Sequence, residues 1–177
     1  MGEGLSFTST VPVDISSSVT KDGLGTWAIG GQGIVTKSSP KLILKEGKLK
    51  ILTAYATGEA VPEVHDGFSF VIARTDDPTD DLYQWGWRCT KSAVSFKGAQ
   101  VRFELDPDTA PTGNDEFKWP MITVQQTRAD ALEPKIKIVA RKMRTRLVRE
   151  DTDVGGAHLT VFSAWCTPNP GLVLVVR

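Results

Sequence analysis

Short segments in which apolar and polar residues alternate constrain the fold of this chain more than any other feature. In Ala99–Leu105, the apolar side chains Val101, Phe103 and Leu105 share one face, and polar side chains occupy the other. A period of two is typical of a β-strand with one buried face. The same alternation recurs in three further segments: Lys48–Ala56, Gly67–Thr75 and Tyr83–Cys89. Turn-forming residues separate these segments, so the sequence predicts many short strands.

Two segments near the C-terminus, Ala157–Thr167 and Leu172–Val176, are apolar on both faces, which predicts strands that are covered on both sides. The segment Lys135–Arg149 fits helical spacing in part, but apolar and polar residues also alternate within each of its halves. A long strand with a bulge near Arg141 explains both halves, because one inserted residue shifts the alternation. We therefore favour a strand over a helix in this segment.

The strand pattern as a whole predicts an all-β fold of about nine or ten strands. The chain has 177 residues, of which 40% are apolar, and this content is sufficient for a buried core. Long connections favour a two-sheet antiparallel sandwich, in the form of a jelly roll, over a closed barrel, in which tight hairpins would be more frequent. We find no repeat of fixed period. The prediction is one domain over residues 1–177, with an N-terminal segment, residues 1–25, that could be extended.

Charge is distributed unevenly although the formal net charge is zero. Residues 1–58 carry a formal charge of +2, residues 59–116 carry −7, and residues 117–177 carry +5. Such a division indicates an acidic side and a basic side, which could attract neighbouring copies to one another in an assembly. Two solvated faces are the simpler interpretation.

The strongest polar feature is a basic strip that contains no acidic residue. It consists of Lys135, Lys137, Arg141, Lys142, Arg144, Arg146 and Arg149. In an extended chain, Lys142, Arg144 and Arg146 project from one face, where they could contact phosphate groups or an acidic subunit surface. A solvated strand face is the alternative.

Four acidic residues crowd the loop that follows Gly67–Thr75. Asp76, Asp77, Asp80 and Asp81 supply the hard oxygen ligands that calcium prefers. The spacing is not that of an EF-hand loop. A calcium site, within the chain or between subunits, is therefore one hypothesis, and solvated turn residues are the other.

Three aromatic residues, Tyr83, Trp85 and Trp87, share one face of the predicted strand Tyr83–Cys89. They could form a flat platform for sugar rings, as in carbohydrate-binding β-sandwich modules. Large aromatic side chains are also suited to a core, since each buries about 150–250 Å². We favour the core, and the exposure of the three rings decides between the two interpretations.

The sequence shows no pattern typical of an enzyme. His65 and His158 are the only histidines, and neither lies in a nucleophile or metal-binding motif. Cys89 and Cys166 form no metal-ligand or disulfide pattern, so we expect a reduced intracellular protein without a cofactor. Gly2 fits the myristoylation pattern loosely. No apolar run is long enough for a membrane span.

The strand pattern and loop lengths resemble those of the jelly-roll coat proteins of small icosahedral RNA viruses. The resemblance covers most of the chain and involves no diagnostic motif. It implies a subunit that assembles through its edges, binds calcium through interfacial aspartates and contacts the genome through a basic inner surface. Those coat proteins commonly begin with an arm rich in Lys and Arg, whereas the first 20 residues here contain neither.

We therefore expect a self-assembling structural protein that is not an enzyme, namely a viral capsid subunit found in the virion and the host cytoplasm. Its partners would be further copies of itself and viral nucleic acid, with no role for a membrane. The alternative is a carbohydrate-binding or adhesin-like β-sandwich that uses Tyr83, Trp85 and Trp87.

Overall fold

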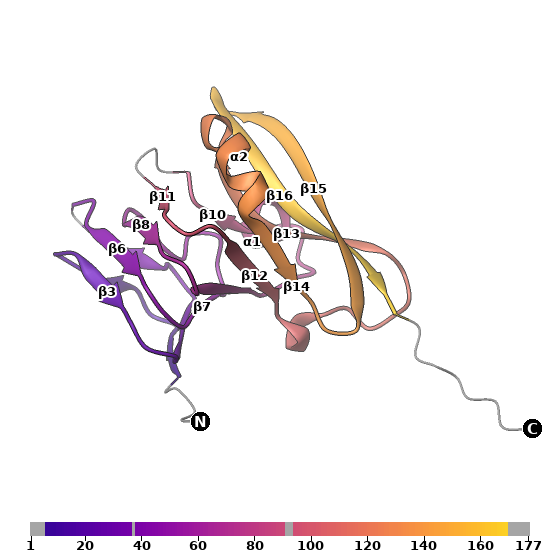
Figure 1. The fold of residues 1–177 in the computed structure, drawn as a ribbon, viewed down its shortest axis with the longest axis horizontal. Helices are drawn as coiled ribbons and strands as arrows, with labels where there is room; N and C mark the ends of the chain where they lie inside the picture. Colours follow the sequence, from indigo (N-terminus) through magenta and orange to yellow (C-terminus); the bar gives the residue numbers. More distant parts are fainter. Residues whose placement is uncertain (1–5, 37, 91–93, 170–177) are drawn as a thin grey trace, which may run out of the picture.

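Short strands that pair in parallel organise the structure, a computed structural model that describes residues 6–36, 38–90 and 94–169. Sixteen strands and two short α-helices lie in this part of the chain (Figure 1). The helices are α1 (Asp81–Trp85) and α2 (Gln126–Leu132), and single 3₁₀ turns, η1 (Pro107–Thr109) and η2 (Glu133–Lys135), accompany them. The prediction of an all-β fold is therefore confirmed.

The largest sheet has six strands, all paired in parallel. In spatial order they are β1 (Phe7–Ser9), β4 (Thr26–Ile29), β7 (Lys48–Ile51), β9 (Ser69–Ile72), β12 (Val101–Leu105) and β14 (Ile136–Val139). This first sheet forms one side of the molecule.

A second parallel sheet and a shorter third one complete the surroundings of the core. The second sheet contains β3 (Val19–Lys21), β6 (Lys41–Leu44), β8 (Val61–Val64) and β11 (Ser95–Phe96). The third contains β2 (Val13–Asp14) and β5 (Ile34–Val35). Backbone hydrogen bonds continue the third sheet through residues 54–56 to β10 (Trp87–Arg88), since Ile34 donates to Ala56 and Arg88 donates to Ala54.

The chain passes through the first, the third and then the second sheet before it returns to the first, so each circuit is one coil of a three-sided stack. β1, β2 and β3 form the first coil, and β4, β5 and β6 form the second. Aligned residues in the first four coils, Phe7, Trp27, Leu49 and Phe70, lie 20, 22 and 21 positions apart. The architecture is a parallel β-solenoid, in which each coil contacts mainly its neighbours.

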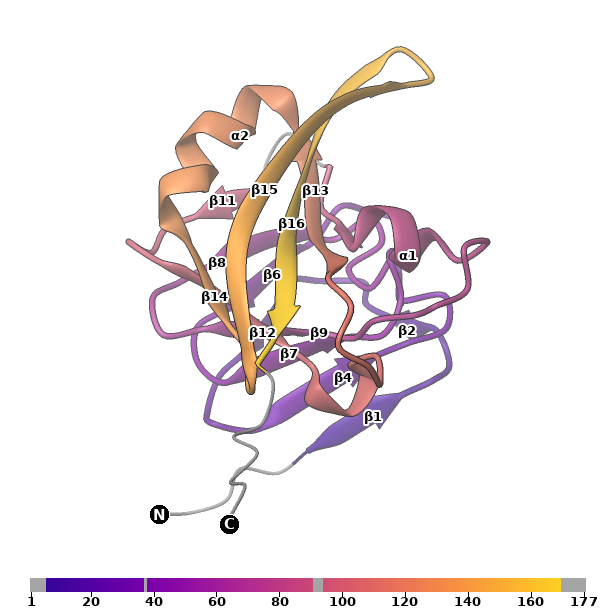
Figure 2. The same cartoon turned by 90° about the vertical axis from the view of Figure 1, so that its right-hand side faces the viewer.

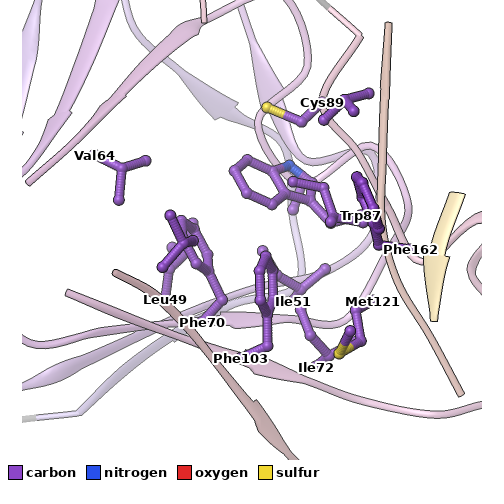
Figure 3. Close-up of a cluster of buried hydrophobic side chains, with 14 of the residues drawn as sticks. Leu49, Ile51, Val64, Phe70, Ile72, Trp87, Cys89, Phe103, Met121 and Phe162 are labelled. Carbon is purple, nitrogen blue, oxygen red and sulfur yellow. The ribbon is translucent and has the colours of Figure 1, made fainter. Parts of the chain in front are cut away.

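Aligned side chains stack inside the solenoid and form its core. Leu49, Phe70 and Phe103 occupy equivalent register positions on β7, β9 and β12, and all three are fully buried. The ring centroids of Phe70 and Phe103 lie 5.6 Å apart, and the Trp87 ring stacks on Phe70 at 4.5 Å. Figure 3 shows Val64 of the second sheet in the same interior. We call the series of residues aligned with Phe103 in the first sheet the core ladder.

An antiparallel sheet extends the third side of the solenoid at its C-terminal end. It contains β13 (Phe117–Gln125), β16 (Ala157–Pro168) and β15 (Met143–Val154), and β10 joins it in parallel. Gly155 and Gly156, both with positive φ, form the two-residue turn between β15 and β16, a conformation that glycine adopts readily. This hairpin extends beyond the rest of the chain in Figure 2.

The prediction of a two-sheet antiparallel jelly roll is wrong, because ten of the twelve strand pairings among the described residues are parallel. Alternation reveals which face of a strand is buried, and it contains no information about the direction of the neighbouring strand. The sequence shows no repeat of fixed period because later coils carry insertions. Phe70 aligns with Phe103, which lies 33 positions further along the chain, since a segment containing α1 enlarges the fourth coil.

The predicted strand Tyr83–Cys89 is also wrong in its first half, where α1 forms. The Asp80 side chain accepts a hydrogen bond from the backbone N–H of Leu82 and caps the helix, and Gly86, with a φ of 59°, ends it. Leu82 and Trp85 are buried at helical spacing. An apparent period of two in so short a segment is therefore also compatible with one helical turn.

The segment Lys135–Arg149 forms strands, as predicted, but they belong to different sheets. β14 and β15 are separated by a turn in which Lys142 has a φ of 58°, so a turn replaces the predicted bulge near Arg141. Residues 7–21, within the N-terminal segment that could be extended, form the first coil. The predicted strand Leu172–Val176 and the candidate myristoylation site Gly2 lie outside the described residues.

Phe103→Ala should lower the free energy of unfolding by about 3–5 kcal/mol, because the core ladder loses a fully buried ring and gains a cavity. Phe7 has the equivalent register position in the first coil but is 62% exposed, so Phe7→Ala should cost less than about 1 kcal/mol. Chemical denaturation of both variants at low protein concentration measures the difference. Equal losses would contradict the packing of the core ladder.

Candidate functional site

The predicted basic strip is divided among different surroundings. The Lys135 ammonium donates to the Phe96 carbonyl oxygen at 2.9 Å, and Arg149 belongs to a cluster of ion pairs. Arg144 and Arg146 are exposed and, two residues apart in β15, project from one face, whereas Lys142, expected in the same row, lies in the turn before β15 with a φ of 58°. Lys137, Arg141 and Lys142 are exposed as well. The strip is therefore no single continuous surface.

Arg149 has a structural role, which the sequence did not indicate. Its guanidinium lies 2.7 Å from Asp130, 3.0 Å from Glu133 and 3.3 Å from Asp151. Hydrogen bonds to Asp130, Glu133 and Asp151 raise its pKa. Asp130 belongs to α2 and Glu133 to η2, so ion pairs of Arg149 connect the β15–β16 hairpin to the segment between β13 and β14.

The four aspartates of the acidic loop each have a local partner. Asp76 pairs with Arg74, Asp77 accepts hydrogen bonds from Thr79, Asp80 caps α1, and Asp81 accepts a hydrogen bond from Tyr55. The hydrogen bonds from Thr79 lower the pKa of Asp77. Within residues 6–36, 38–90 and 94–169, no group of three or more His, Cys, Asp or Glu side chains could hold a metal ion. The geometry thus gives the calcium hypothesis no support.

The three aromatic residues of the predicted sugar platform do not share an exposed face. Trp87 is fully buried, and its Nε1–H donates to the Thr57 hydroxyl at 3.0 Å. Trp85 is buried as well, whereas Tyr83 is 43% exposed on α1. Trp85 and Trp87 are core residues, and only Tyr83 remains available for a ligand.

A hollow of about 310 Å³ lies along the first half of β13, next to α1 and residues 73–75. We call it the Trp165 pocket. Its lining includes the charged residues Arg74, Glu116 and Lys118 and the aromatic residues Tyr83 and Trp165. β10 pairs with β13 only at Ile122 and Thr123, so residues 117–120 face this hollow without a partner strand from β10.

Glu116 holds the Trp165 ring in place at the rim of the Trp165 pocket. The Trp165 Nε1–H donates to one carboxylate oxygen at 2.9 Å, and the Thr167 hydroxyl donates to the other at 2.9 Å. The hydrogen bonds from Trp165 and then Thr167 lower the pKa of Glu116. The Arg146 guanidinium lies over the Trp165 ring, 5.3 Å from its centroid, in cation–π geometry.

The other feature of note is the end of the solenoid formed by residues 7–24, which comprise the first coil and the start of the turn that leads to the second coil. We call it the open end. β1, β2 and β3 are the edge strands of their sheets. Phe7, Val11 and Leu24 are 62%, 66% and 65% exposed, the highest values among the large apolar side chains of the described residues. Apolar side chains and unpaired strand edges therefore coincide at one end of the molecule.

The edge strand β1 is short, and it lacks the charged side chains that protect many edge strands. The strand reads Phe-Thr-Ser and contains no charge, whereas the edge strand β15 carries several cations, including Arg144 and Arg146. Charged side chains at an edge discourage pairing with another chain. The Ser9 carbonyl oxygen accepts a hydrogen bond from Gly30, so the backbone groups of Thr8, one residue earlier, face the open side.

Comparison with protein-family models, with curated proteins and with solved structures finds no match for this chain. Among the described helices, none is both long and apolar enough to cross a membrane. Cys89 and Cys166 are buried free thiols, and burial raises the pKa of Cys166 to about 11.

Both features of interest were missed by reasoning from the sequence. Glu116 and Trp165 are 49 positions apart, and no local pattern links them before β13 and β16 pair. Phe7 belongs to a short alternating segment, but its exposure depends on the absence of a coil on its outer side among the described residues.

Glu116→Gln should destabilise the protein at pH 7, because the carboxylate is a stronger acceptor for the Trp165 and Thr167 donors than an amide oxygen. Since the folded-state pKa of Glu116 is lowered, its stabilisation is present above the unfolded-state pKa and is lost as pH falls through the folded-state value. The difference in unfolding free energy between wild type and variant should therefore shrink toward acid pH. Urea unfolding across pH measures it, with the exposed neighbour substitution Asp115→Asn as a control. A gap that is constant with pH would contradict this role.

Proposed function

We propose that the protein is a structural subunit that associates with a second copy of itself through the open end of the solenoid. The observation that carries the proposal is the position of Phe7 on the core ladder. The aligned residues Leu49, Phe70 and Phe103 are fully buried by the coils on either side, whereas Phe7 is 62% exposed. A second copy would supply the apolar cover that further coils supply elsewhere.

The backbone of β1 supports pairing with an identical strand. Thr8 presents its N–H and C=O on the side away from β4, and β1 has no charged side chain that would repel a partner. Two copies related by a two-fold axis would pair their β1 strands in antiparallel orientation, since an isologous contact places the same residues on both sides. Backbone hydrogen bonds and the side chains of Phe7 and Val11 would then form one interface.

The opposite end of the solenoid favours such a head-to-head contact over a continuous head-to-tail stack. There the third sheet continues into β13, β16 and β15, and α2 buries Ala129 and Leu132 (Figure 1). The edges at this end are β14 (Ile136–Val139) in the first sheet and β11 in the second, and β14 carries the exposed cation Lys137. Heterologous stacking of β1 on β14, which would generate a filament, would bring a charged strand to the interface, whereas two β1 strands bring no charge.

A viral coat subunit is the more specific form of this proposal. Because the fold is a parallel solenoid, resemblance to jelly-roll coat proteins no longer supports a coat function. Self-association is still a property that a coat subunit needs. Contact with nucleic acid would involve exposed cations such as Arg144 and Lys142, which have the charge to bind phosphate. A shell would further require contacts besides the open end, because one isologous interface closes after two copies.

Thr8→Pro tests the proposal with little effect on the isolated subunit. Proline removes the outward N–H of Thr8, while the hydrogen bond to the Ser9 carbonyl within the first sheet is retained. We expect wild type to form dimers, and we expect Thr8→Pro and Phe7→Lys to weaken dimerisation by about tenfold or more. Sedimentation equilibrium over a range of protein concentrations measures the dissociation constants.

Val154→Lys is the matched control, since Val154 is an exposed apolar residue at the tip of the β15–β16 hairpin, far from β1 in the fold (Figure 2). It introduces the same charge as Phe7→Lys and should leave the dimer unchanged. A wild-type protein that stays monomeric at high concentration would refute the proposal. A dimer that Thr8→Pro and Phe7→Lys leave intact would place the interface elsewhere.

A further inference from the structure

We propose that the Trp165 pocket binds a saccharide unit that carries a carboxylate, such as a hexuronic or sialic acid residue. This site is separate from the open end, so the inference does not depend on self-association. Its volume of about 310 Å³ lies near the lower limit of ligand pockets, which indicates a ligand of one sugar ring with its substituents.

Aromatic surfaces on two sides of the Trp165 pocket suit the flat apolar face of a sugar ring. Tyr83 is 43% exposed on α1, and Trp165 lies on β16, the partner strand of β13. Arg146 covers the Trp165 ring and does not line the hollow. Because Glu116 and Arg146 fix the orientation of the Trp165 ring, a sugar would meet a surface that is already in place.

The charges at the Trp165 pocket favour an acidic ligand. Two cations, Arg74 and Lys118, and one carboxylate, Glu116, line it. Arg74 pairs with Asp76, and Lys118 lies 2.8 Å from Glu150. A guanidinium has five donors and an ammonium has three, so both cations retain donors for a ligand carboxylate.

The remaining polar groups suit the hydroxyl groups of a sugar. Each Glu116 oxygen accepts one hydrogen bond from the protein and keeps a lone pair for a further donor.

An extended peptide is the other occupant that an unpaired strand edge can accept. Pro120 argues against it, because a proline removes a backbone donor from the edge that the peptide would need. Because α1 also borders the hollow, a peptide strand would have little length of β13 to pair with besides residues 117–120. We therefore favour the saccharide.

A glycan array that includes termini with uronic and sialic acids, followed by calorimetric titration of the tightest acidic glycan, tests the proposal. The methyl ester of that glycan is the matched probe, since it keeps the shape and loses the charge. We expect esterification to weaken binding by about tenfold or more, and Tyr83→Ala and Lys118→Gln each to do the same. Circular dichroism checks that the variants are folded.

Val154→Ala and Arg102→Ala are the control variants, since they shorten an exposed apolar side chain and remove an exposed cation that do not line the Trp165 pocket. Both should bind the acidic glycan like wild type. The proposal is overturned if no acidic glycan binds at millimolar concentration, or if acid and ester bind equally. It is also overturned if Tyr83→Ala and Lys118→Gln have no effect, or if only extended peptides compete for the site.

Discussion

The in-register stacking of apolar side chains between parallel coils is the interaction on which the rest of the structure depends. Leu49, Phe70 and Phe103 lie directly above one another because their strands pair at matching positions. Each buried ring then contacts aligned neighbours and the residues of the other two sheets, Trp87 among them (Figure 3). A shift of one residue in any strand would turn its apolar side chains outward, so burial and register enforce each other.

The same dependence explains why the two ends of the solenoid differ. A coil inside the stack has neighbours on both sides, whereas the first coil has one among the described residues. Its ladder residue, Phe7, is consequently exposed, although its strand pairs with β4 like any other. At the other end, the antiparallel sheet and α2 cover the core, and Arg149 connects them through ion pairs. The two ends therefore differ in how far their apolar side chains are exposed.

Departures from the regular coil supply the side chains that line the Trp165 pocket. The insertion in the fourth coil carries α1 with Tyr83, and the connection before β13 carries Glu116. Because β10 is short, it leaves residues 117–120 of β13 unpaired, and the Trp165 pocket lies there. In a regular coil, backbone pairing would occupy this edge. Binding groups thus gather where the repeat is interrupted, while the regular part supplies a rigid frame.

The amino-acid sequence by itself determined that the chain is built of strands and which side chains of many strands are buried. Val101, Phe103 and Leu105 are buried as the alternation predicted, because a period of two follows from the backbone of each strand alone. Only the tertiary structure decided the direction of pairing, the three-sided coil and the meeting of Glu116 with Trp165. These features depend on contacts between residues that are distant in sequence, and insertions of unequal length conceal the repeat that would have revealed them. The tertiary structure also left Phe7 exposed at the open end, since the number of neighbouring coils is a property of the stack and not of any one segment.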